Sequence, residues 1–450
     1  MENEGIENEI EQRKEKIPQL DDKKTILSWA FYDWANSAFA TTVMAGFFPL
    51  FFELYWSYGN STTQTTYYLG LGNSIASIIV AALAPFLGAV ADKMSGKKKL
   101  LTFFAFLGII MTGALWQVAL GKWKMAIAFY ILGTVGFSGG NIFYDSLLTG
   151  VASEKKVDYV SSLGFGLGYI GGGILFTINV LMYLMPESFG LADGNQAIKV
   201  SFLTVALWWA LFSIPILIWV KEPYIEDSLS FSKSIKAGWL QLRNTFDEIK
   251  HLKYVGIFLL GYWFYIDGVD TIIRMAVNYG TSLGFEPQDL ITALLITQFV
   301  AFPGTLLFNK FAEKIGIKNG ILVAIGAYIG ITIGGYFMDD EIDFYILAVC
   351  IGCFQGGIQA LSRSLYSRLI PKEKSAEFYG FFNMLGKFAA VIGPALMGIV
   401  TAQTGNIRIG ILSILILFVL GGSILWKVDI EEGEKMAKEY LAKPFVEKDF

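Results

Sequence analysis

The chain alternates between long apolar runs and short polar stretches. A helix needs about 20 apolar residues to cross the hydrocarbon core of a bilayer. Six runs of at least about that length occupy the first half of the chain, at 27–55, 67–91, 100–120, 125–149, 159–184 and 202–220. Six more occupy the second half, at 254–279, 290–311, 320–338, 344–369, 378–402 and 409–426. The pattern predicts an all-α integral membrane protein with twelve transmembrane helices in two six-helix bundles.

The longest internal polar stretch separates the two sets of runs. Within it Phe231, Trp239 and Phe246 belong to an apolar series that recurs every three or four residues, which is typical of an amphipathic helix. This helix either lies against the cytoplasmic membrane surface or is an ordinary linker helix without a role of its own. The predicted organisation is an N-terminal tail, a first bundle, this linker, a second bundle and a C-terminal tail, at 1–25, 26–221, 222–252, 253–428 and 429–450.

The positive charges predict the orientation. Of the 35 Lys and Arg residues, 28 lie in the two tails and in the loops on the same side as the tails. Only four lie in the loops of the other side, and three lie inside spans. Loops rich in Lys and Arg stay in the cytoplasm. Both termini are therefore expected to be cytoplasmic, in a multi-pass protein of the cell membrane.

Composition agrees with a chain that lies in the lipid bilayer and excludes several functions. Apolar residues make up 54% and charged residues 16%, against about 25% charged residues in soluble domains. The net charge of −4 gives no reason to expect nucleic-acid binding. Cys350 and Cys353 share one apolar run and the only histidine, His251, is distant in sequence, so we expect buried thiols and no metal site or cofactor. No clustered catalytic set is present, so we do not expect an enzyme.

Weak internal repeats relate the two halves. DWANS at 33–37 in the first span matches DGVDT at 267–271 in the seventh, and both follow aromatic residues. A Gly-Gly pair at 139–140 in the fourth span matches another at 356–357 in the tenth. This order is the one that a six-plus-six duplication requires.

Charged residues inside the spans mark the expected pathway for a solute. A charge in mid-membrane is costly and usually faces a bundle interior or an aqueous cavity. Six of seven such residues fall on the first, fourth, seventh and tenth spans, and Lys387 on the eleventh is the exception. The six are Asp33, Asp145, Asp267, Asp270, Arg274 and Arg363. We expect these four helices to line a central cavity.

Two interpretations of these charges remain open. Asp267, Asp270 and Arg274 share one helix face, where Asp270 and Arg274 could simply neutralise each other. Alternatively, an arginine binds an anionic group of the substrate while a carboxylate carries a coupling proton. Uncharged polar residues could bind the solute or hydrogen-bond between helices. The candidates of this kind are Asn36, Asn141, Tyr144 and Gln359.

One motif resembles a nucleotide-binding fingerprint. GLGYIG at 166–171 satisfies G-x-G-x-x-G, but it lies inside an apolar helix rather than after a strand. We therefore expect close helix packing there.

A short polar loop carries a broader resemblance. The segment GAVADKMSGKKK at 88–99 resembles the signature loop of the major facilitator superfamily, G-x-x-x-D-R-x-G-R-K, with Lys93 in place of the arginine. The resemblance implies the major facilitator fold and a gating loop in which Asp92 latches the two halves on the cytoplasmic side. The matching residues are Gly88, Asp92, Lys93, Gly96 and Lys97. The cationic cluster could also serve only to fix orientation.

A narrower resemblance spans both halves. YDWANSAF at 32–39, SSLG at 161–164 with GYIGG at 168–172, and QGGIQALSRS at 355–364 resemble the vacuole-effluxer (autophagy-related) branch of that superfamily. The compact loops are similar to those of bacterial members. Fungal members of this branch export amino acids from the vacuole, which implies a related cargo here.

The predicted function is secondary transport of a small polar solute, an amino acid or similar zwitterion, by alternating access. Proton coupling through Asp33 and Asp267 is a hypothesis. The expected partners are the solute, the lipid bilayer and protons, with the protein as a monomer. One alternative is a lipid or lipid-linked saccharide flippase of the same fold, which needs a lateral opening. Another is a non-transporting sensor, which needs an output domain.

Overall fold

The computed structural model describes residues 20–60, 62–94, 96–222 and 252–442, apart from the side chains of 62–63, 66–67, 94, 277–278, 287, 387–391 and 441–442. The expected amphipathic linker helix and the side chain of Lys387 lie outside the described residues.

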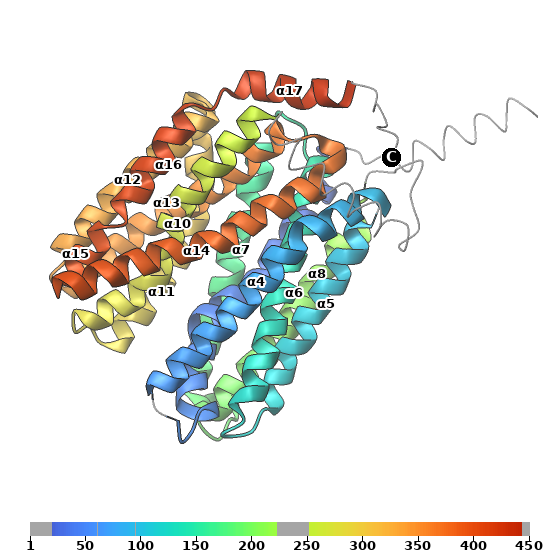
Figure 1. Ribbon diagram of the computed structural model, residues 1–450. Coiled ribbons are helices and arrows are strands. Elements are labelled where there is room, and N and C mark those ends of the chain that lie inside the picture. The colour runs from blue at the N-terminus through green and yellow to red at the C-terminus, as the bar shows by residue number, and fades with distance from the viewer. Residues whose placement is uncertain (1–19, 61, 95, 223–251, 443–450) are drawn as a thin grey trace, which may run out of the picture.

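The first bundle begins with a span that is not a uniform α-helix. After α2 the chain continues through π-helical turns at Phe39–Phe47 and Phe52–Trp56 on either side of the short α3. π-helical turns are rare and are found mostly as single turns inside α-helices. The helices of this bundle are α2 (Lys23–Ala38), α3 (Phe48–Phe51), α4 (Thr62–Met94), α5 (Lys97–Ala114), α6 (Trp123–Val151), α7 (Val157–Leu184) and α8 (Gly194–Trp219) (Figure 1).

The second bundle ends with a helix that leaves the bundle axis. Its helices are α10 (Lys253–Ser282), α11 (Pro287–Ile315), α12 (Ile317–Phe337), α13 (Glu341–Leu369), α14 (Ser375–Thr404), α15 (Ile407–Leu412), α16 (Leu415–Trp426) and α17 (Ile430–Ala442). Side chains cap several helices, as when Asp340 accepts a hydrogen bond from the Asp343 N–H at the start of α13.

Eleven helical segments within the described residues are long and apolar enough to cross a membrane. They correspond to all the predicted spans but one. The remaining predicted span, 378–402, lies within α14, a helix of 30 residues that runs beside the others (Figure 1). The prediction of an all-helical membrane protein is therefore confirmed.

The bundles have apolar interiors and apolar outer surfaces. Each contains its own cluster of buried apolar side chains, with Trp29, Trp56 and Trp209 fully buried in the first. On α8 a stripe of Leu207, Leu211 and Ile218 is largely exposed. Such a face suits lipid, because a helix satisfies its own backbone groups and can present apolar side chains to the hydrocarbon core.

The GLGYIG segment at 166–171 packs α7 tightly against α2. A Cβ atom on Gly168 would lie 2.7 Å from Ser37 Oγ, and one on Gly171 would lie 2.7 Å from the Trp34 ring. Only glycine allows such a close approach of two helices. The expectation that this motif serves helix packing is confirmed.

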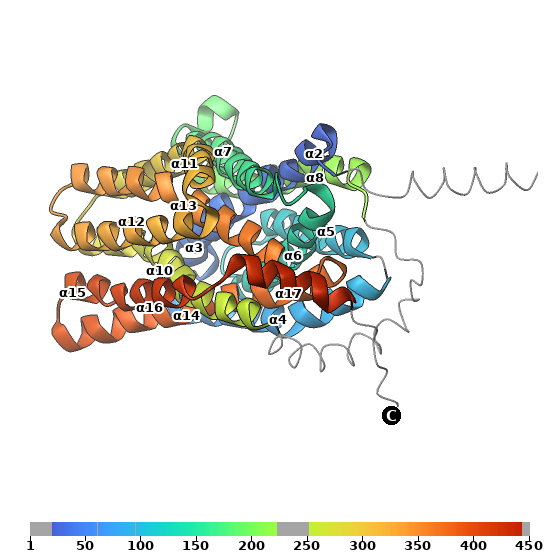
Figure 2. The same ribbon diagram turned by 90° about the horizontal axis from the view of Figure 1, so that it is seen from above.

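The two bundles converge at one end of the molecule and diverge toward the other (Figure 1). We call the end that carries α17 and the turns before α7 and α14 the closed end, and the opposite end the open end. Between the bundles, α4 crosses α14, and α7 packs against α11 and α13. Seen from above, α17 lies over the junction of the bundles (Figure 2). The positive-charge rule predicts that the closed end is cytoplasmic.

Candidate functional site

A polar cavity of about 170 Å³ lies between the bundles. Its walls come from α2, α6 and α7 of the first bundle and from α10, α13 and α14 of the second. The residues that line it are Asp33, Asn141, Tyr144, Asp145, Phe165, Tyr262, Ile266, Asp270, Gln359, Arg363, Phe382, Asn383 and Gly386. Charged groups of both signs, amides and aromatic rings therefore face one common space.

Arg363 of α13 joins the two bundles at this cavity. Its Nη1 lies 3.1 Å from Asp145 Oδ1 and 3.5 Å from Asp33 Oδ2. Its Nε donates to Ser161 Oγ at 2.9 Å, and its Nη2 donates to the Ser161 carbonyl oxygen at 2.8 Å. All these partners belong to the first bundle, so one guanidinium with its fixed fork of donors holds three helices of the opposite bundle.

Aromatic rings enclose the same guanidinium. Its carbon lies 4.1 Å from the Phe165 ring centroid, 4.9 Å from that of Trp29 and 5.4 Å from that of Tyr144. The Trp29 and Tyr144 rings are stacked at 4.3 Å. Cation–π contacts of this kind gain strength where water is excluded. We call Arg363, its partners Asp33, Asp145 and Ser161, and these rings the arginine cage.

The two carboxylates of the cage have additional donors. Tyr144 Oη donates to Asp33 Oδ2 at 3.1 Å, and the Asn383 amide nitrogen donates to Asp145 Oδ2 at 3.1 Å. The Asp33 and Asp145 side chains are 12% and 10% exposed, while that of Arg363 is only 3% exposed. Two carboxylates share one guanidinium, and their side chains are slightly more exposed than that of the arginine.

Most of the residues singled out from the sequence meet at the cavity, but three do not line it. Asn36 donates to the Asn141 side-chain oxygen at 2.6 Å within the first bundle. Asp267 is buried against α14, and Arg274 is exposed on α10. Those that line the cavity are Asp33, Asn141, Tyr144, Asp145, Asp270, Gln359 and Arg363.

The loop at 88–99 lies at the closed end. Asp92 accepts hydrogen bonds from the backbone N–H groups of Ala376 and Glu377, the first turn of α14, at 3.2 and 2.8 Å. A carboxylate is favoured there because the first turn of a helix has free N–H groups and a positive partial charge. Lys97, not Lys93, forms the ion pair with Asp92, at 2.9 Å, and also donates to Ser375 Oγ at 2.7 Å.

Two glycines allow the helices to cross at this point. A Cβ atom on Gly88 would overlap the carbonyl oxygen of Ala376, and one on Gly380 would lie 2.5 Å from the carbonyl oxygen of Ala84.

Gly96 precedes α5 as its N-cap residue, and the Lys97 N–H donates to Glu222 at 2.9 Å. Burial raises the pKa of the Glu222 carboxyl, against the opposing effect of this N–H group.

Further ion pairs cover the closed end. Arg368 of α13 lies 2.7 Å from Asp158 of α7 and 3.7 Å from Glu434 of α17. Glu154 of the first bundle receives Lys438 of α17 at 3.3 Å and Lys372 at 3.8 Å. The C-terminal segment, expected to be a simple tail, thus forms a helix that contacts both bundles.

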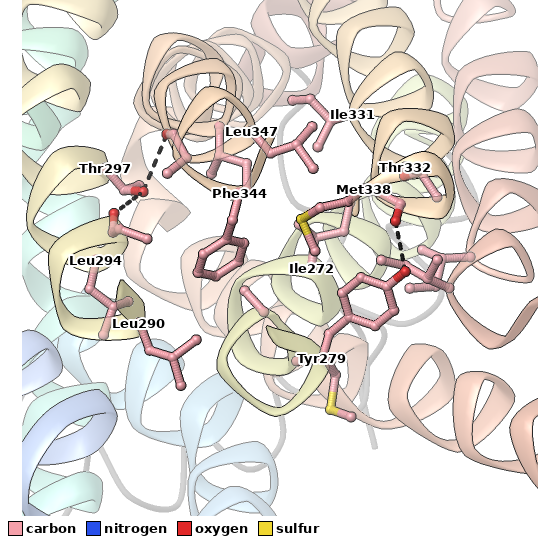
Figure 3. Close-up of a pocket in the computed structure, with 18 of the residues that line it drawn as sticks. Ile272, Tyr279, Leu290, Leu294, Thr297, Ile331, Thr332, Met338, Phe344 and Leu347 are labelled. Atoms are coloured by element: carbon pink, nitrogen blue, oxygen red, sulfur yellow. Dashed lines mark hydrogen bonds between the residues drawn. The ribbon is translucent and has the colours of Figure 1, made fainter. Parts of the chain in front are cut away.

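A second, apolar cavity of about 60 Å³ lies inside the second bundle (Figure 3). Its hydroxyl groups are already bonded to the main chain. Tyr279 donates to the Gly335 carbonyl oxygen at 2.7 Å, and Thr297 donates to that of Ala293 at 2.9 Å. The other labelled residues, including Leu294, are mostly apolar. This cavity does not suit a polar solute.

Sequence reasoning missed several members of the site. Ser161, Phe165 and Asn383 contact the charged residues only because α7 and α14 fold against α13 and α6. Ser161 lies in the SSLG segment that carried the family resemblance, and this was the only signal that could have identified it.

Comparison with known proteins gives the same fold. The chain is similar to the human organic anion transporter MFSD10, with 12% identity, 90% of this chain and 100% of that one covered, and a TM-score of 0.70. It is similar to the proton:xylose symporter XylE, with 14% identity, 93% and 98% covered and a TM-score of 0.68. The fold of the chain is that of the major facilitator superfamily.

Sequence relatives are more specific. The chain is 39% identical over 421 residues to the MFS-type transporter YxiO of Bacillus subtilis (strain 168), covering 92% of this chain and 96% of that protein. It is 24% identical over 478 residues to autophagy-related protein 22 of Eremothecium gossypii, covering 92% and 93%. Residues 54–438 match the family described as "Vacuole effluxer Atg22 like". The chain therefore belongs to the vacuole effluxer Atg22-like family, and it is a multi-pass membrane transporter.

Proposed function

We propose that this protein is a secondary transporter of a small zwitterion, most simply an amino acid, and that the solute binds in the polar cavity. The observation that carries this proposal is the arginine cage. It places two carboxylates that line the cavity beside one guanidinium, so the cage holds an excess of negative charge. A positively charged ammonium group of the solute balances that excess.

The rest of the cavity supports the zwitterion. Asn141 and Gln359 use their side-chain oxygens to accept hydrogen bonds from Asn36 and Tyr169, which leaves their amide NH₂ groups to donate to a carboxylate. The cavity volume of about 170 Å³ suits a solute smaller than a drug-sized ligand. This size supports an amino acid rather than a lipid.

The cage also supports a mechanism. Arg363 belongs to one bundle and its anionic partners to the other, so the closed end opens only when these contacts break. An ammonium group at Asp33 and Asp145 competes with Arg363 and weakens the contact. A proton on either carboxylate has the same effect. Ligands shift a two-state equilibrium in this way when they favour one state over the other.

We place the protein in the cell membrane, as a monomer. Its 39% identity to the bacterial protein YxiO supports that membrane over the vacuole. The cavity is complete within one chain, which supports a monomer.

The test is a thermal-shift screen of the purified protein with each of the twenty amino acids and with xylose as a sugar control. An amino acid that binds only the folded protein should stabilise it by about 2.7 kcal/mol at a hundred times its Kd. The same amino acid should lose this effect with Asp33→Asn and keep it with Glu187→Gln, an exposed acid outside the cavity. Stabilisation by xylose and by no amino acid would exclude the proposal.

The amino acid found in this way is then used in counterflow across proteoliposomes with a pH gradient. If the cage carries the coupling proton, the gradient drives uptake in the wild type but not in Asp33→Asn. Wild-type uptake that ignores the gradient contradicts proton coupling but leaves solute transport intact.

A further inference from the structure

Asp267 is a buried acid that the cavity does not use. Its side chain lies on α10, and the residue is only 1% exposed. Oδ1 accepts a hydrogen bond from the Gly393 N–H of α14 at 3.0 Å and from the Thr271 hydroxyl at 3.3 Å. Oδ2 is buried and has no hydrogen-bond partner among the described residues.

No cation of the described residues pairs with Asp267. On α10 its charged neighbour is Asp270, which faces the cavity. From α13, Ser362 is bonded to Tyr265, while Arg363 points to the first bundle. From α16, Phe418 and Gly421 lie beside Gly268 and Tyr265. Among the described residues, α14 contributes the Gly393 N–H. A buried carboxyl in such surroundings is a group that binds a proton.

The contact with α14 falls at a weak point of that helix. Pro394 has no N–H and its ring disfavours a regular helix one turn earlier. Gly393 is required because a Cβ atom would overlap the Thr271 hydroxyl. The Gly393 N–H points to Asp267, so the carboxyl caps the part of α14 that begins at Pro394, much as an N-cap residue does before a proline.

The two parts of α14 have different neighbours. The part before the proline begins at the closed end, where Ala376 and Gly380 contact α4 of the first bundle. The part after it includes Met397 and Thr401, which contact Gly410 of α15 in the second bundle. A change in the angle between the two parts would therefore move the second bundle relative to the closed end.

We propose that Asp267 is a second proton-binding site, separate from the arginine cage, which sets the conformation of α14. The ionised carboxylate is the better acceptor for the Gly393 N–H and holds α14 as it is seen here. Proton binding weakens the cap and frees the later part of α14 to move. The inference rests on the proposed function only in that the protein alternates between two conformations.

Protonation is tested by infrared difference spectroscopy of the full-length protein in lipid, between acidic and alkaline pH. We expect a protonated-carboxyl C=O band that is lost in Asp267→Asn and kept in Glu187→Gln. A spectrum unchanged in Asp267→Asn would overturn the proposal. If that variant does not fold, Thr271→Val keeps the acid and removes one hydrogen bond, so it should shift the same band. A band that does not shift in Thr271→Val would also overturn the proposal.

Movement is tested by the distance between spin labels at Lys122→Cys and Gln403→Cys, both exposed at the open end, with Cys350 and Cys353 replaced by serine. We expect the wild-type distance distribution to change with pH, and Asp267→Asn to show the acidic distribution at every pH. A pH response that persists in Asp267→Asn would contradict the proposal.

Asp267→Asn should retain the thermal shift with the amino acid found above. Loss of that shift would show that Asp267 belongs to the solute site, and would leave the proposed function standing.

Discussion

Arg363 joins the second bundle to three helices of the first. Replacing it by methionine leaves Asp33 and Asp145 buried without their cation, which should lower the free energy of unfolding by about 3–5 kcal/mol. Denaturation in detergent measures this loss. Arg408→Met is the matched control, because Arg408 pairs with the exposed Asp339 and should cost about 1 kcal/mol or less.

A compensated variant separates charge from packing. Arg363→Met combined with Asp33→Asn and Asp145→Asn removes the unpaired charges and should recover most of the lost stability. If the triple variant is no more stable than Arg363→Met alone, the cation–π packing with Trp29 and Phe165 is the larger contribution.

The sequence indicates which helix bears each charge, but not which neighbour the charge meets. Asp33, Asp145 and Arg363 could be assigned to a common site because charges in a membrane avoid lipid. Asp267 satisfies the same argument, yet it contacts Gly393 of α14 rather than the cavity. Its direction depends on the rotation of α10 against α14, which is a property of tertiary packing.

At the scale of elements, the crossing of α4 and α14 provides a clean test. Gly88→Ala places a methyl group against Ala376, whereas Gly70→Ala on the same helix meets nothing within 4 Å. Both changes gain the same helix propensity, about 1 kcal/mol, so their difference isolates the crossing. Spin labels at Lys155→Cys and Glu373→Cys, exposed at the closed end, should show longer distances with Gly88→Ala only. Equal distances in both variants would mean that the crossing tolerates the methyl group.

Apolar runs predict the elements well because a membrane permits few alternatives to a long helix. The run at 159–184, for example, is α7 (Val157–Leu184). The π-helical turns at Phe39–Phe47 lie inside the apolar run at 27–55 and leave no comparable signal. α17 is too short and too polar to be a span, and its docking through contacts such as Lys438 with Glu154 is a property of tertiary packing.

For the whole molecule, two kinds of contact hold the closed end, and they differ in burial. The side chains of the Asp92–Lys97 pair and of Arg363 are almost fully buried. The pairs of Glu154 with Lys372 and Lys438 are between 41% and 63% exposed. Salt screens exposed charges much more than buried ones. The two kinds of contact therefore respond differently to the solvent.

Glu154→Gln should modestly raise the population of molecules in which the two bundles have separated at the closed end. Exposed ion pairs contribute about 1 kcal/mol or less, which is about fivefold in the ratio of the two states. The label pair at Lys155 and Glu373 reports this shift. Raising salt from about 0.1 M to about 1 M should move the wild type in the same direction and erase the difference between wild type and Glu154→Gln. Asp92→Asn should produce a larger shift that persists at about 1 M salt, because its ion pair with Lys97 is buried. If Glu154→Gln kept its full effect at high salt, the contact of α17 with the first bundle would depend on packing rather than on charge.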